Sequence, residues 1–162
     1  MKFFQASADA YSFEFNLREK QMLFQVLGLY PLVPVAHHRL SRRVGEPNRE
    51  NQAWLAESLA AHREETRQKV RQLMTNPGNF PAKGGGFRWT AARADLEWMM
   101  QVLNDVRVGS WLALGSPDLE VARQVAPKQE ELAHWVTMDV AGGFETIFIA
   151  ALAGELPVQA DG

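Results

Sequence analysis

The chain opens with two short runs in which apolar and polar residues alternate. The runs extend from Lys2 to Ser7 and from Tyr11 to Phe15, and a short link joins them. In the second run Phe13 and Phe15 alternate with polar residues, which is the period of a half-buried strand. We predict a β-hairpin here. Because a lone hairpin is marginally stable in water, we expect it to lie against a helix.

A helical period follows the hairpin. Asn16 and Glu19 have the spacing of a capping box, which predicts a helix from Leu17 to Tyr30 that ends at the following prolines. A second, long helix is predicted from Asn48 to Met74. Its two ends are apolar and its middle is polar on every side, so we expect it to project beyond the core. Apolar ends that one protomer leaves uncovered often become symmetric interfaces, which predicts self-association.

The second half of the chain predicts two more long helices. Thr90 is the expected N-cap of one, which ends near Gly115, and a short helical segment follows around residues 118–124. The last helix is predicted from about Lys128 to Ala153. It is apolar over most of its surface, so we expect it to be the central helix of the fold.

These elements predict a mainly α fold: an antiparallel helix bundle with a short N-terminal β-hairpin. The length of 162 residues fits a single domain spanning residues 1–162. Within it, residues from about 75 to 86 contain two prolines and four glycines, a composition that predicts a flexible loop.

Composition and charge exclude several classes of protein. Without cysteine, the chain has no disulfide, no catalytic thiolate and no cysteine zinc site. A net charge of −2 argues against a nucleic-acid-binding protein, because a phosphate backbone is held by a basic excess. The first residues lack the apolar stretch of a signal peptide, and no apolar run approaches the roughly 20 residues that span a bilayer. We expect a cytoplasmic protein that does not bind membranes.

One basic cluster is a candidate contact site for an anion or an acidic partner: His37, His38, Arg39, Arg42 and Arg43. A solvated connecting loop is the plainer interpretation of the same residues. Adjacent histidines point in different directions, and no His-Glu-x-x-His pattern is present. We therefore expect no metal and no cofactor.

The most unusual run extends from Leu103 to Gly109, inside an apolar helix. Asparagine, aspartate and glycine each cost up to about 1 kcal/mol in a helix interior relative to alanine, so the run needs a reason. We predict a polar network in which Asp105 or Arg107 is buried and contacts the last helix. Its candidate members are Asn104, Asp105, Arg107, Asp139 and Glu145. The network either fixes helix register or surrounds a functional site.

The same region carries a family resemblance. The segment from Glu97 to Val108 resembles the signature of the DUF2017 family, a tryptophan followed by Leu-Asn-Asp-Leu-Arg-Leu and small residues. Residues Ala133 to Asp139 resemble a later aromatic-rich segment of that family. The chain departs from the pattern after Arg107, where it reads Gly109 to Leu112 instead of Gly-Thr-Arg-Leu, and residues 47–86 match no segment of it. The resemblance implies a helical domain of unassigned function and transfers no catalytic residue.

Two functions remain open. The absence of a catalytic constellation, the long half-polar helix and the glycine-rich loop favour a non-enzymatic protein-interaction or regulatory module with an unidentified protein partner. The alternative is an enzyme or small-ligand-binding protein whose polar site lies around Asn104, Asp105 and Arg107.

Overall fold

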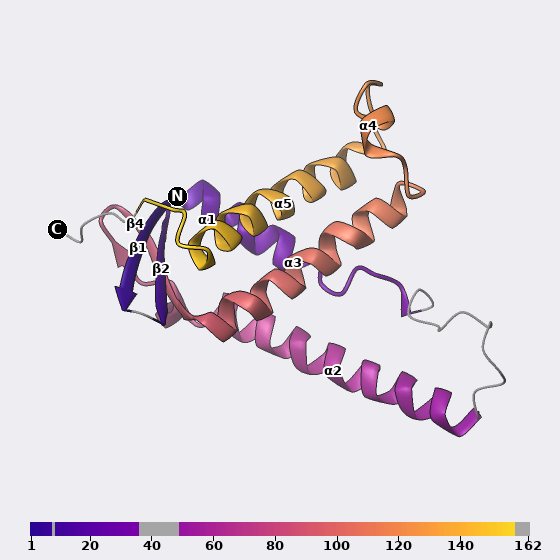
Figure 1. The fold of residues 1–162 in the computed structure, drawn as a ribbon, viewed down its shortest axis with the longest axis horizontal. Helices are drawn as coiled ribbons and strands as arrows, with labels where there is room; N and C mark the ends of the chain where they lie inside the picture. The colour runs from indigo at the N-terminus through magenta and orange to yellow at the C-terminus, as the bar shows by residue number, and fades with distance from the viewer. Residues whose placement is uncertain (8, 36–48, 158–162) are drawn as a thin grey trace.

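The computed structural model describes residues 1–7, 9–35 and 49–157. Its described part contains a four-stranded antiparallel sheet and five α-helices. The sheet lies at one end of an elongated molecule, and α3 (Arg93–Ala113) and α5 (Leu132–Leu152) extend from it as a packed pair (Figure 1). The long helix α2 (Arg49–Thr75) leaves the sheet end at an angle to this pair.

The prediction of a helix bundle with a lone hairpin is wrong, because the sheet has two further strands. The predicted hairpin is present as β1 (Lys2–Ser7) and β2 (Ala10–Phe15). It is extended by β4 (Gly86–Ala92) and β3 (Ala82–Lys83), in the order β1-β2-β4-β3. The fold is therefore mixed α/β rather than mainly α.

The strand β4 was missed because its polar residues were interpreted as the start of a helix. Phe87, Trp89 and Ala91 alternate with polar residues and face the core, which is a strand period. Thr90 is not a helix cap. Its hydroxyl lies across the strand pair, 2.6 Å from the hydroxyl of Ser12, and α3 begins only after Ala92.

The glycines predicted to form a flexible loop make a tight turn between β3 and β4. Gly84 and Gly85 have φ angles of 63° and 83°, which residues with a Cβ rarely adopt. Residues 77–79 form a short 3-10 helix before β3. The 75–86 segment thus adds a hairpin to the sheet edge.

The other predicted helices are present with shifted ends. In α1 (Leu17–Leu27), the Asn16 and Glu19 capping box forms in both directions, which confirms that prediction, but the helix stops before Tyr30. The short segment is α4 (Leu119–Ala122), capped by the carboxylate of Asp118.

The core lies between one face of the sheet and the helices α1, α3 and α5. Aromatic residues of the strands meet aromatic residues of α5, and the rings of Phe13 and Phe148 are 5.0 Å apart. Leu23 and Leu27 of α1 and Leu103 of α3 complete it without exposure to solvent. Burying such apolar surface is the main stabilising contribution to the fold.

The other face of the sheet holds an ion-pair cluster. The buried carboxylate of Glu14 lies 3.2 Å from Arg88 and 3.5 Å from Lys2. The hydrogen bond from Arg88, helped by Lys2, holds the pKa of Glu14 below its usual value. The guanidinium of Arg88 also stacks on the ring of Phe4.

Candidate functional site

Asp105 fastens the chain that leaves α1 to the side of α3. Its carboxylate accepts hydrogen bonds from the backbone N–H groups of Leu32 and Val33, at 2.6 and 3.2 Å. From the other side, Arg63 of α2 donates to the carbonyl oxygen of Val33 at 2.8 Å. Residues 32–33 are thereby held between α2 and α3. These contacts give hydrogen-bond partners to backbone N–H and C=O groups that lie outside any helix or strand.

Gly109, one turn further along α3, gives this segment room. A Cβ atom at position 109 would lie 2.6 Å from the Cβ of Leu32, closer than real Cβ contacts allow. The glycine is therefore explained by the close approach of another backbone, in spite of its low helix propensity.

Arg107 contacts the last helix, but it is not buried as predicted, because its side chain is 42% exposed. Its Nε lies 2.9 Å from a carboxylate oxygen of Glu145, although the N–H is not aimed along that line, so the contact is an ion pair rather than a directed hydrogen bond. The same guanidinium donates to Asn104 at 2.7 Å. Burial raises the pKa of Glu145, and Arg107 offsets only part of that rise.

The remaining candidates do not join this network. Asp139 pairs with Arg123 instead, and both of these side chains are well exposed. The basic cluster at residues 37–43 lies outside the described residues. Asn104, Asp105, Arg107 and Glu145 therefore act in two separate contacts, one to the chain after α1 and one to α5.

An apolar helix, α5, is only partly covered by the rest of the fold. Met138, Ala141, Phe144, Phe148 and Ala151 face the core, but only 28% of an 18-residue apolar stretch of the helix is buried. The opposite side of the helix, which we term the α5 outer face, consists of Leu132, Val136, Asp139, Gly143, Thr146 and Ala150, whereas the half-buried Val140 and Ile147 beside it pack against the core. Five of the six residues of the face are exposed and Ala150 is half-buried. α5 thus contributes Phe144 and Phe148 to the core and packs on α1 and α3, as expected of a central helix, but one side of it is left uncovered.

The α5 outer face is nearly free of charge. Asp139 is its one ionisable residue, and that carboxylate is paired with Arg123. Gly143 lies near the middle of the face, and a Cβ added there would meet no atom within 4 Å. Nothing within the described protein thus explains a glycine at this position.

Two further exposed apolar residues lie in and just after α4. Val121 and Val125 are mostly exposed, and Figure 1 shows α4 at the tip of the molecule, beside the start of α5. By length and composition alone, α5 is the one helix among the described residues that would span a membrane. The exposed patch was missed because an apolar helix is usually enclosed, and sequence alone did not show how few elements cover α5.

The two ends of α2 differ in how they are covered. Val70 is buried and Met74 half-buried near the C-terminal end, whereas Trp54 near the N-terminal end is 67% exposed and Leu55 is also exposed. The polar middle lies largely in solvent, as predicted. Self-association through the uncovered end stays a prediction, which light scattering on the purified chain tests.

Among residues 1–7, 9–35 and 49–157, no three histidine, aspartate or glutamate side chains gather in a position to hold a metal ion. Comparisons of the chain with protein-family models, with curated proteins and with solved structures find no match.

Proposed function

We propose that the protein is a non-enzymatic protein-interaction module and that the α5 outer face is its docking surface. The observation that carries the proposal is that so little of the most apolar helix is buried. Contiguous exposed apolar surface on a protein marks interaction sites. The face follows several turns of one straight helix, which is the shape that an amphipathic helix of a partner can cover.

The chemistry of the face defines the partner. Its residues offer apolar contact and almost no charge, so the partner helix presents an apolar stripe of its own. Gly143 removes a side chain near the middle of the contact and lets the two backbones approach closely. An anionic membrane surface is a poorer match, because α5 contains no lysine or arginine to contact lipid headgroups.

The alternative of a polar site around Asn104, Asp105 and Arg107 has less support. Asp105 already accepts two backbone N–H groups, and Arg107 is engaged by Asn104 and Glu145. A group that binds or transforms a ligand needs free hydrogen-bonding capacity facing that ligand. The resemblance to DUF2017 and the cytoplasmic location stay predictions and add no catalytic role.

The test replaces two residues of the α5 outer face with lysine. Val136 is 59% exposed and Gly143 faces open space, so Val136→Lys with Gly143→Lys should leave the fold intact. Leu17→Lys, an equally exposed apolar position on α1, is the matched control. Each variant is tagged and purified from the organism that produces it, and bound proteins are quantified by mass spectrometry.

We expect a stoichiometric partner that the wild type and Leu17→Lys retain and that the double variant loses. A partner retained by all three proteins would contradict the proposal. The proposal would also be contradicted if light scattering showed a homodimer that the same double substitution dissociates. The α5 outer face would then bind a second copy of the chain rather than a different protein.

A further inference from the structure

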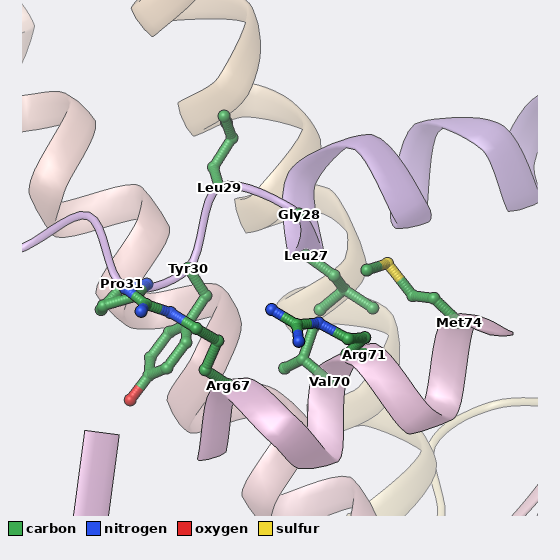
Figure 2. A pocket seen from close by; sticks show the side chains of 9 residues that line it. All are labelled: Leu27, Gly28, Leu29, Tyr30, Pro31, Arg67, Val70, Arg71 and Met74. Atoms are coloured by element: carbon green, nitrogen blue, oxygen red, sulfur yellow. The ribbon is translucent and has the colours of Figure 1, made fainter. Parts of the chain in front are cut away.

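A cavity lies between the end of α1 and the C-terminal half of α2. It has a volume of about 420 Å³, and Tyr30, Pro31 and Met74 give it its partly exposed apolar surface (Figure 2). The volume falls within the range of about 300–1,000 Å³ that is usual for small-molecule sites. This cavity is separate from the α5 outer face, so the inference does not depend on the proposed function.

The walls of the cavity are held in place by the fold. The turn that follows α1 is closed by backbone hydrogen bonds from Leu29 to Val26 and from Tyr30 to Leu27. Two residues later, Asp105 fixes Leu32 and Val33 to α3. On the other wall, the side chain of Val70 is buried in the core. A site preformed in this way loses little entropy when a ligand binds.

The charge in the cavity has one sign. Arg67 and Arg71 line it and no carboxylate does. The two arginines are four residues apart, so they lie one turn apart on the same side of α2. Figure 2 shows both side chains reaching from α2 toward the turn at residues 29–31.

Neither guanidinium has a strong partner within the described chain. Arg67 lies 3.3 Å from Glu64 of its own helix, and both of these side chains are about half exposed. Arg71 forms no ion pair with any described residue. Two like charges one turn apart repel each other, and an oxyanion placed between them would convert that repulsion into attraction.

We propose that this cavity binds a small organic anion, a carboxylate or phosphate ester whose apolar body rests on Met74, Pro31 and the ring of Tyr30, the apolar lining residues that are only partly buried. Arg67 and Arg71 hold the oxyanion through their N–H groups, which match both carboxylate and phosphate oxygens. The apolar wall selects against bare inorganic anions, and the paired positive charge selects against neutral molecules of the same shape.

The test measures the binding of four probes to the full chain by calorimetry: phenyl phosphate, 3-phenylpropanoate, inorganic phosphate and 3-phenylpropanol. We expect the two organic anions to bind more tightly than inorganic phosphate and the neutral alcohol. The ratio of their dissociation constants shows whether the site prefers phosphate or carboxylate. If neither organic anion binds with a dissociation constant below about 10 mM, the proposal is overturned.

Three variants locate the binding. Arg71→Met and Arg67→Met should each weaken binding of the organic anions about tenfold, the effect of losing one charge-assisted hydrogen bond. Arg18→Met, which removes an exposed arginine near the opposite end of α1, should leave binding unchanged. If all three variants lost affinity equally, the attraction would be non-specific and the site would be overturned. The site would also be overturned if Arg71→Met and Arg67→Met both bound the organic anions as tightly as the wild type. Should Arg67→Met fail to fold, the exposed Arg71→Met decides alone.

Discussion

Gly109 of α3 lies so close to Leu32 that a Cβ atom on residue 109 would come within 2.6 Å of the Leu32 Cβ. The two residues are far apart in the sequence, and their contact fixes where the chain runs after α1. Asp105, one turn earlier on α3, holds the backbone of the same segment. Together the two α3 residues explain why a helix interior contains an aspartate and a glycine.

Gly109→Ala should therefore destabilise the protein although alanine favours helices. The added methyl group pushes on the backbone and side chain of Leu32, and overpacking of this kind costs about 1–3 kcal/mol. Urea denaturation measures the change in the free energy of unfolding. Gly143→Ala is the matched control, since open space surrounds that glycine, and it should stabilise the protein by about 0.5–1 kcal/mol. Equal effects at the two positions would refute the close contact.

Asp105→Ala should leave the N–H groups of Leu32 and Val33 without their acceptor. Stranded polar groups of this kind cost about 1–3 kcal/mol, and Asp105→Asn should cost less because one acceptor oxygen remains. Asp139→Ala removes an exposed ion pair and should change the free energy of unfolding by less than about 1 kcal/mol. The contact is disproved if Asp105→Ala is as harmless as Asp139→Ala in the same denaturation experiment.

The ion pair between Arg107 and Glu145 predicts a pH dependence. Burial raises the pKa of Glu145 above its usual 4.5, so the folded protein holds this proton more tightly than the unfolded chain does. The stabilising contribution of this group is complete below about 4.5 and is lost as pH rises through the raised pKa. Glu145→Gln has no group that titrates at this position, so its free energy of unfolding should not show this loss of stability with rising pH.

The free energy of unfolding is measured at intervals from pH 4 to pH 8. The value for Glu145→Gln should rise relative to that of the wild type as pH increases, and the difference should level off above the raised pKa of Glu145. A difference that stays constant over the range, or that falls with pH, would show that desolvation does not dominate at Glu145.

Glu14 should behave in the opposite sense. Arg88 and Lys2 lower its pKa, so its contribution to stability is present above the unfolded value of 4.5 and is lost as the pH falls through the folded value. Glu14→Gln should be less stable than wild type at neutral pH, and the gap should close in acid. Thermal unfolding of both proteins at pH 7 and in steps down to pH 2 measures this difference in stability. A difference that widens on acidification would contradict a lowered pKa for Glu14.

Local patterns predicted local structure well. The alternation around Phe13, the capping box at Asn16 and Glu19 and the apolar period of the helices each depend on neighbouring residues, and the structure contains all of them. Thr90 shows the limit of such patterns, because a threonine before a helical run fits a cap and a strand end equally well. Thr90 belongs to a strand because it pairs with Ser12, which lies 78 residues away in the sequence.

The unusual run in α3 could be recognised from the sequence, but its role could not. Poor helix formers at 104, 105 and 109 indicated a constraint. The partner of Asp105 is backbone at residues 32–33, and backbone groups carry no sequence signal that would identify them. The uncovered side of α5 depended likewise on which elements pack against the helix, a property of the whole fold.

The most direct test of the docking surface is photo-crosslinking inside the cells that produce the protein. Benzoylphenylalanine replaces Val136 on the α5 outer face or, as the control, Leu17 on α1, two apolar side chains that are equally exposed. We predict a crosslinked adduct with a different protein of defined mass at position 136 and none at position 17. No adduct at position 136, or the same adducts at both positions, would contradict the assignment of α5 as the surface that binds a partner.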